Sequence, residues 1–231
     1  MSYIKVQNLA VSYSKQIVLG NLNFEAKKSE FVSVVGKSGC GKTTFLNALA
    51  GLIPFKGEVY FSGTVGMVFQ NNSVFPWMTV KNNIRFGLEN LSLEETNQLV
   101  SASLHLAEIN DRKDKYPCEL SGGQIQRVAL ARTLAHDSDV LLMDEPYGAL
   151  DADTRDKMQA WLLDIWSLTE KTVIFVTHNI EEAIFLADRI ITLKNGGIDK
   201  EFTVDFGRPR NEDIKFLPKF NELKKEIHDS L

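Results

Sequence analysis

The chain has 231 residues, of which 44% are hydrophobic and 24% are charged. This length and composition suffice for one well-packed core, built as one or two domains. Lys and Arg number 26 against 30 Asp and Glu, so the net charge is −4. That balance argues against a general nucleic-acid-binding protein, because such proteins present a basic surface.

The N-terminus, the apolar runs and the cysteines exclude further classes. Met1–Asn8 lack the basic start and the apolar stretch of an export signal. Apolar runs such as Val140–Met143 and Val173–Val176 are far shorter than the ~20 residues that a membrane-spanning helix needs, so we expect a chain that does not cross a membrane. Cys40 and Cys118 form no CxxC pair, which is typical of reduced thiols.

Along the chain, apolar and polar residues first alternate between Ile4 and Phe24, which predicts antiparallel strands joined by turns. A continuous apolar strand, Phe31–Val35, then leads into a glycine-rich loop. A helix is expected from Thr43 to Leu49, ending near Gly51. Two short strands are expected next, at Glu58–Phe61 and Gly66–Phe69.

Between residues 71 and 135 the apolar residues recur at helical spacing, as at Leu99, Ala102 and Leu106. Buried strands then return and alternate with helices, at Val140–Met143, Val173–Val176 and Ile190–Leu193. Such strands predict a parallel sheet covered on both faces. After Gly197 the chain is polar, and the charged run Lys219–Lys225 predicts a solvated helix.

The segment Gly36–Thr43, Gly-Lys-Ser-Gly-Cys-Gly-Lys-Thr, fits the phosphate-binding pattern G-x-x-x-x-G-K-[ST]. Its glycines let the backbone wind tightly and point N–H groups at a phosphate, and the positive end of the following helix adds to the attraction. We expect Lys42 to reach the β- and γ-phosphates and the Thr43 hydroxyl to ligate Mg²⁺. A chance glycine-rich turn is the alternative, and the flanking strand and helix argue against it. The pattern indicates that the chain binds a nucleotide, but it does not identify the nucleotide or the function that the nucleotide serves.

Asp144 and Glu145 follow the apolar run Val140–Met143, and the carboxyl end of a buried parallel strand meets the ligand crevice of an open α/β sheet. We expect Asp144 to hold Mg²⁺, directly or through water, and Glu145 to orient or deprotonate the attacking water. Alternatively, these acids and Pro146 merely open a surface loop. The phosphate loop weakens that alternative, because the metal needs an acidic partner.

A second anion-binding segment is Leu120-Ser121-Gly122-Gly123-Gln124, which opens a helix expected at Ile125–Ala135. A serine cap followed by glycines leaves N–H groups available to a phosphate. A chain with two phosphate-binding motifs and a single set of catalytic residues suggests that two copies form a dimer. In that dimer, this segment of one copy closes on the nucleotide bound by the other.

With these motifs in this order, the sequence resembles the nucleotide-binding subunit of ABC transporters over nearly its whole length. The resemblance implies four more site residues: Tyr13 stacking on adenine, Gln70 contacting Mg²⁺ and the attacking water, Asp151 in the Gly148–Asp151 loop between paired subunits, and His178 contacting the γ-phosphate. Without that context they read as an edge-strand aromatic, a polar loop residue, a helix cap and a structural histidine, respectively.

The resemblance implies ATP as the nucleotide. Its contacts are then expected from Tyr13, Gly36, Lys37, Ser38, Gly39, Cys40, Gly41, Lys42, Thr43 and Thr44 of one copy, and from Ser121, Gly122, Gly123, Gln124 and Asp151 of the second copy. Catalysis is expected from Glu145, His178, Gln70 and Lys42, and Mg²⁺ binding from Thr43, Gln70 and Asp144.

The expected fold class is α/β: a P-loop NTPase core with a mainly parallel sheet and flanking helices, an N-terminal antiparallel β subdomain and an inserted α-helical subdomain. We expect a single ABC ATPase domain over residues 1–231. Its core and β subdomain take residues 1–70 and 136–195, its helical subdomain about 71–135, and its C-terminal tail 196–231.

A finer resemblance is to importers of the nitrate/sulfonate/taurine/bicarbonate type, carried by Phe75–Val80, Asn82–Leu88, Met158–Trp166 and Arg208–Arg210. Tyr147 departs from the phenylalanine frequent in the family, which is a conservative change. In the family, a groove beside the Gln70 loop receives a short helix of the membrane subunit. Phe75 and Trp77 either line that groove or pack within the helical insert.

We therefore expect an ATP-hydrolysing importer subunit that powers uptake of a small anionic solute. Its expected partners are a second copy in an ATP-induced head-to-tail homodimer, membrane permease subunits and, indirectly, an extracytoplasmic solute-binding protein, with no nucleic acid. Its expected place is cytoplasmic, on the inner face of the membrane through the permease. A soluble ATPase in an assembly role is the remaining alternative. The similar ATPase heads of chromosome and DNA-repair machines are disfavoured, because long coiled coils interrupt those heads and this chain has no heptad run. The solute itself is not encoded in this chain.

Overall fold

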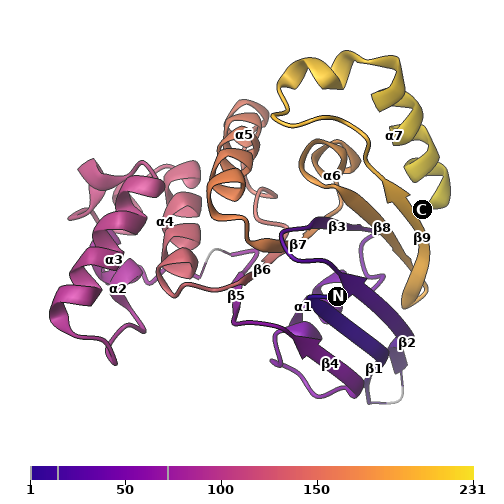
Figure 1. The fold of residues 1–231 in the computed structure, drawn as a ribbon, viewed down its shortest axis with the longest axis horizontal. Helices are drawn as coiled ribbons and strands as arrows, with labels where there is room; N and C mark the ends of the chain where they lie inside the picture. Colours follow the sequence, from indigo (N-terminus) through magenta and orange to yellow (C-terminus); the bar gives the residue numbers. More distant parts are fainter. Residues whose placement is uncertain (1, 15, 72) are drawn as a thin grey trace.

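Two β-sheets and their helices set the position of the glycine-rich loop (Figure 1). The computed structural model describes residues 2–14, 16–71 and 73–231. The expectations that include Met1, Lys15 and Asn72 therefore lie, at those positions, outside the described residues.

The N-terminal sheet is antiparallel, as the alternating pattern predicts. It has the strand order β2-β1-β4, with β1 at Ile4–Tyr13, β2 at Gln16–Ala26 and β4 at Lys56–Phe61. Its apolar face packs on the first helix, where the rings of Phe24 and Phe45 meet edge to face at 5.7 Å. This sheet therefore fixes one side of the helix that follows the glycine loop.

The central sheet is mainly parallel and has the order β5-β6-β7-β3-β8-β9. Its strands are β5 at Val65–Val68, β6 at Val140–Asp144, β7 at Thr172–Thr177, β3 at Phe31–Val35, β8 at Arg189–Lys194 and β9 at Gly197–Thr203. Every residue of β3, β6 and β7 is buried, which fits their continuous apolar sequences. Because these three strands are parallel neighbours, their carboxyl ends meet at one edge of the sheet.

Helices flank the sheet and fill the stretch between β5 and β6 (Figure 1). The flanking helices are α1 at Lys42–Leu49, α5 at Ala152–Thr169 and α6 at Ile180–Leu186. The inserted ones are α2 at Val80–Arg85, α3 at Leu93–Leu106, the short 3₁₀ turns Asn110–Arg112 and Pro117–Glu119, and α4 at Gly122–Ala135. Helix α4 begins three residues before the expected Ile125, because Ser121 caps it.

The tail adds two features that the sequence did not predict, the strand β9 and the docking of the tail helix. Strand β9 pairs antiparallel with β8, and the other strand pairs of this sheet are parallel, so the sheet is mainly parallel, as expected. After the 3₁₀ turn Glu212–Phe216, helix α7 at Pro218–Ser230 lies against α6 and buries Phe220 and Ile227 (Figure 1). The charged run hid this packing, because its charges face outward while the apolar residues recur at helical spacing on the other face.

Among the described residues, none of the helices combines the length and the apolar character needed to cross a lipid bilayer.

Candidate functional site

The glycine loop joins the end of β3 to the start of α1 with little space for side chains. A Cβ at Gly36 would lie 2.5 Å from Cys40 Sγ and 2.6 Å from the Leu193 carbonyl oxygen. Gly41 has φ 108°, a conformation that favours glycine. Within the described residues, α1 begins without a side-chain cap or an acidic residue in its first turn, unlike α3, α4, α5 and α6. Its first N–H groups therefore fit a phosphate.

Lys42 is the buried cation of this loop, with its side chain 5% exposed. Its Nζ donates to the carbonyl oxygens of Gly36 at 2.8 Å and Lys37 at 3.2 Å. The same Nζ lies 3.7 Å from Glu145 Oε1. The ammonium group is thus held between the loop backbone and a carboxylate from the end of β6, where it can exchange these oxygens for those of a phosphate.

Thr43 and Asp144 supply neighbouring oxygens. The Thr43 hydroxyl donates to Asp144 Oδ1 at 3.2 Å. Burial raises the pKa of the Asp144 carboxyl above its usual value, and the Thr43 hydroxyl and the Lys42 ammonium oppose this shift. Mg²⁺ is usually held by one or two protein oxygens together with substrate phosphates and water, so this donor set fits Mg²⁺. Among the described residues, no group of three or more His, Cys, Asp or Glu side chains is placed to hold a metal.

Glu145 and His178 face each other across the ends of β6 and β7. His178 Nδ1 lies 2.8 Å from Glu145 Oε2. The backbone of Glu145 has φ 43°, in the left-handed region that residues other than glycine seldom adopt, and its N–H donates to the Val176 carbonyl at 2.9 Å. A carboxylate held in a strained conformation beside a lysine and a histidine is an arrangement found at functional sites.

Five of the expected site residues thus form one connected cluster at the edge of the sheet: Lys42, Thr43, Asp144, Glu145 and His178. Gln70 lies outside these contacts, exposed, two residues past the end of β5. Tyr13 ends β1 and is 49% exposed. Of the other loop residues, Lys37, Ser38 and Gly39 are exposed, and Cys40 and Thr44 are half-buried.

The Ser121 segment is organised separately. Ser121 Oγ accepts from the Gln124 N–H at 3.4 Å, and Gln124 Oε1 accepts from the Ser121 N–H at 3.0 Å. A Cβ at Gly122 would lie 3.0 Å from Leu150 Cδ2, and one at Gly123 would lie 3.0 Å from Thr154 Cγ2. The glycines therefore let α4 pack closely on the loop at residues 148–151 and on α5.

Helix α4 groups with α2 and α3, apart from α1 (Figure 1). The two segments expected to bind phosphate thus lie in different parts of one chain. Asp151 caps α5, with its Oδ1 accepting from the Thr154 N–H at 2.9 Å. A helix cap is the alternative that the sequence allowed for Asp151, and the cap leaves the residue exposed.

Sequence reasoning did not single out Glu182, Arg155 and Thr177, which form polar contacts behind His178. Glu182 stands next to Glu181 in the first turn of α6, where acidic residues are common because they favour a helix N-terminus. Burial distinguishes Glu182, at 5% exposed, from its neighbour, and the sequence carries no clear signal of that difference.

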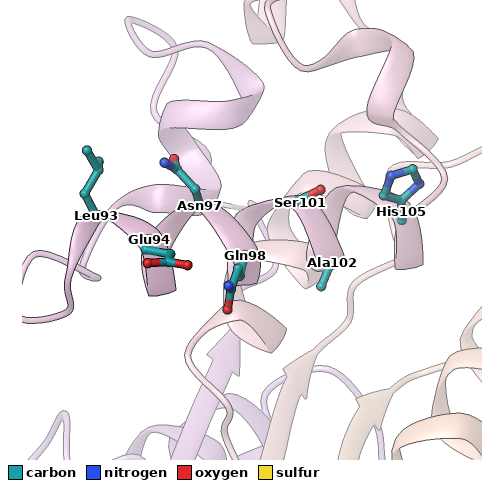
Figure 2. Close-up of a pocket in the computed structure, with 7 residues that line it drawn as sticks. All are labelled: Leu93, Glu94, Asn97, Gln98, Ser101, Ala102 and His105. Atoms are coloured by element: carbon teal, nitrogen blue, oxygen red, sulfur yellow. The ribbon is translucent and has the colours of Figure 1, made fainter.

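Two surface hollows differ in their relation to the expected site residues. One of about 500 Å³ borders the exposed side of the glycine loop, between residues 16–18, 37–40 and 193–196. Another of about 840 Å³ follows α3, and Figure 2 shows the residues that line it along this single helix: Leu93, Glu94, Asn97, Gln98, Ser101, Ala102 and His105. None of these is an expected site residue, so the hollow beside the glycine loop is the better candidate for a nucleotide.

The chain is similar to known proteins over most of its length. The family profile described as ABC transporter matches residues 19–148, a range that contains Gly36–Thr43 and Leu120–Gln124. A taurine import ATP-binding protein of Jannaschia sp. is 42% identical, over 90% of this chain and 84% of its own length. An aliphatic sulfonates import ATP-binding protein of Bacillus cereus is 40% identical, over 97% of this chain and 94% of its own. A dimeric ATP-binding cassette solved in a post-hydrolysis state with ADP and phosphate has a TM-score of 0.76 and 33% identity, covering 88% of this chain and 100% of the other.

Proposed function

This chain belongs to the ABC transporter family and is an ATPase of that family, and we propose that it powers the uptake of a small anionic solute through a separate membrane permease. The observation that carries the proposal is the cluster of Lys42, Thr43, Asp144, Glu145 and His178 at one edge of the sheet. The solute class is supported by the similarity to ATPases of taurine and sulfonate import, since a sulfonate is an anion.

ATP binds with its phosphates on the N–H groups of the glycine loop and of α1, including Thr44. Lys42 turns from the carbonyls of Gly36 and Lys37 to the β- and γ-phosphates. Tyr13 stacks on adenine. Thr43, Asp144 and Gln70 would hold Mg²⁺, which would supply positive charge against the triphosphate.

Hydrolysis depends mainly on positioning and on charge stabilisation. Glu145 orients a water molecule and accepts its proton as the water oxygen bonds to the γ-phosphorus. The bond from that phosphorus to the β–γ bridging oxygen breaks, which gives ADP and phosphate. Gln70 contacts the same water, and His178, 2.8 Å from Glu145, contacts the γ-phosphate.

A second copy completes each site. Ser121, Gly122, Gly123, Gln124 and Asp151 of that copy close over the ATP, so two chains pair head to tail around two ATP molecules. This is supported by the separation of α4 from α1 within one chain and by the dimeric form of the similar cassette (Figure 1). Closure then acts on the permease, and hydrolysis reopens the pair.

A groove beside the Gln70 loop suits a short permease helix. It measures about 470 Å³ between β5 and the inserted helices, and its lining includes Phe69, Phe75 and Phe86. The Phe75 ring lies 4.6 Å from that of Phe86, so Phe75 both lines the groove and packs within the insert. Trp77 is 69% exposed, and its ring lies 5.3 Å from that of Phe75. Apolar and aromatic side chains of this kind favour the core of an interface.

The proposed place of the protein follows from this contact: it lies on the cytoplasmic face of the membrane, held by the permease, and an extracytoplasmic solute-binding protein acts through that permease. Tagged chain purified in mild detergent should bring down a multi-span membrane protein. Recovery of a water-soluble partner alone would favour an assembly role instead. The chain is proposed to form one domain. Its core and β subdomain take residues 1–70 and 136–195, its helical subdomain about 71–135, and its C-terminal tail 196–231.

The proposed chemistry is tested by Glu145→Gln, which keeps the size of the side chain and removes its basicity. This variant should bind ATP, accumulate as a closed dimer in size-exclusion chromatography, and lose turnover by about 100-fold or more. Glu181→Gln is the matched control, because Glu181 contacts Lys224 of the tail rather than the cluster. Hydrolysis by Glu145→Gln at the rate of the unmodified chain would show that Glu145 has another role.

A further inference from the structure

Glu182 is a buried carboxylate that the proposed mechanism does not use. It lies in the first turn of α6, and its Oε2 accepts a hydrogen bond of 2.5 Å from the Thr177 hydroxyl. Thr177 Oγ1 in turn accepts from the Asn179 N–H at 3.0 Å. Thr177 and Asn179 are the two chain neighbours of His178, so these contacts fix the backbone on both sides of that histidine.

Arg155 approaches Glu182 from α5. Its Nε lies 3.5 Å from Glu182 Oε1, and its Nη2 donates to the Leu150 carbonyl oxygen at 2.8 Å. Leu150 belongs to the loop at residues 148–151 and packs against Gly122 at the start of α4. One guanidinium group therefore contacts both the loop that ends in Asp151 and the carboxylate that holds the His178 backbone.

Stability alone does not account for a charged group at this place. Burial raises the pKa of the Glu182 carboxyl, and Thr177 and Arg155 offset this only in part. When folding raises the pKa of a carboxyl group, its ionised form at neutral pH lowers the free energy of unfolding. Replacing a buried charged side chain by an uncharged one of similar size often leaves stability unchanged or increases it. Within the described residues, Arg155 Nε is also buried without a hydrogen-bond partner, and its 3.5 Å distance to Glu182 Oε1 is that of an ion pair only, so the pair is not optimised for hydrogen bonding.

We infer that Glu182 and Arg155 are positioning residues that link the backbone of His178 to the loop at residues 148–151. The inference rests on the proposed function, in which His178 contacts the ATP of its own copy and Asp151 contacts the ATP held by the second copy. Through the link, a displacement of the loop at residues 148–151 is transmitted to the backbone at His178. Each chain thereby couples its contact with its own ATP to its contact with the ATP of the second copy. Packed elements joined by hydrogen bonds and ion pairs carry such coupling.

The test measures ATP hydrolysis by the full-length chain against ATP concentration for Glu182→Gln, Arg155→Gln and the double variant. We expect kcat to fall about 10-fold in each single variant and by the same ~10-fold in the double variant, because two residues that act as a unit are not additive. The Hill coefficient for ATP should fall toward 1, while KM stays within about two-fold of its native value.

Glu181→Gln is again the matched control, with the same substitution one residue away on α6. It removes an ion pair with Lys224 but touches neither loop, so kcat and the Hill coefficient should stay within about two-fold of native. Native kinetics in Glu182→Gln would overturn the link. So would single effects that multiply to about 100-fold in the double variant. Recovery of both kcat and unfolding temperature in the double variant would likewise overturn it, since that result would show a merely structural pair.

Thr177 provides a second test if Glu182→Gln does not fold. Thr177→Ser keeps the hydroxyl that bonds to Glu182, so its kcat should stay within about two-fold of native, whereas Thr177→Val should fall about 10-fold. Equal rates in the two variants would overturn the link.

The unmodified chain and Glu145→Gln are measured in the same assay. If the unmodified chain does not hydrolyse ATP, the proposed function fails. If it does, and Glu145→Gln stops turnover while Glu182→Gln has no effect, the link alone fails.

Discussion

Arg210 holds the end of α6, the helix that directly follows His178, and Arg210→Met tests that role. The Arg210 side chain is 1% exposed. Its Nη1 donates to the carbonyl oxygens of Ile184 at 3.1 Å, Phe185 at 2.9 Å and Ala187 at 2.8 Å. Carbonyls at a helix C-terminus have no further partner within the helix, so this guanidinium group takes the place of a cap.

The expected loss of stability follows from two opposing effects. Hydrogen bonds to a charged group contribute roughly 1.5–3 kcal/mol each, so three give roughly 5–9 kcal/mol. Against this, burial lowers the pKa of the Arg210 guanidinium to about 10, a cost of about 3 kcal/mol for the charged form at about 1.4 kcal/mol per unit. Methionine fills the space but satisfies none of the carbonyls. We therefore expect Arg210→Met to lower the free energy of unfolding by about 2–6 kcal/mol.

Urea unfolding followed by far-UV circular dichroism measures this loss. Lys219→Met is the control: it removes an exposed tail ion pair with Asp205 and should cost less than about 1 kcal/mol. A free energy of unfolding for Arg210→Met within about 0.5 kcal/mol of native would refute the reasoning, since surface substitutions have effects of that size.

Three further predictions follow from the site and the tail. Lys42→Ala should lower hydrolysis about 100-fold or more, because it removes the cation held between the loop and Glu145, whereas Lys28→Ala, at an exposed lysine outside the expected site, should not; equal rates would contradict the phosphate role. Phe220→Ala should lower the free energy of unfolding in urea by about 3–5 kcal/mol, since Phe220 is buried. Phe216→Ala should lower it by less than about 0.5 kcal/mol, since Phe216 is 82% exposed, and similar losses in the two variants would show that α7 is not docked. Burial raises the pKa of the Glu182 carboxyl, so the stabilising contribution of this carboxyl is fully present below its unfolded pKa and is lost as pH rises through its folded pKa. The stability of Glu182→Gln relative to the native chain should therefore increase from about pH 4 to about pH 8. A decrease would contradict the burial effect.

Much of the fold is visible in local patterns. Period-two alternation marks the N-terminal sheet, and the apolar runs mark β3, β6 and β7. The tail helix was expected, and α7 includes the charged run Lys219–Lys225. Strand β9 and the docking of α7 were not predicted, because both elements are polar on the exposed side and their buried residues pack on other elements. Phe75 escaped a single assignment for a related reason: it lies where the insert meets the groove, and it contributes to both.

By itself, the sequence predicted phosphate binding at Gly36–Thr43 and Leu120–Gln124, because glycines, a lysine and a helix start are local features of the chain. It also determined that Asp144, Glu145 and His178 follow buried strands, which placed them at one sheet edge once those strands became parallel neighbours. Only the tertiary structure decided which of Glu181 and Glu182 is buried, and that Arg155 and Arg210 bind carbonyls of other loops and helices. Burial and such hydrogen bonds depend on contacts between segments far apart in this chain, as between Arg189 and Glu30 at a separation of 159, and the residues next to them in the sequence do not indicate those contacts.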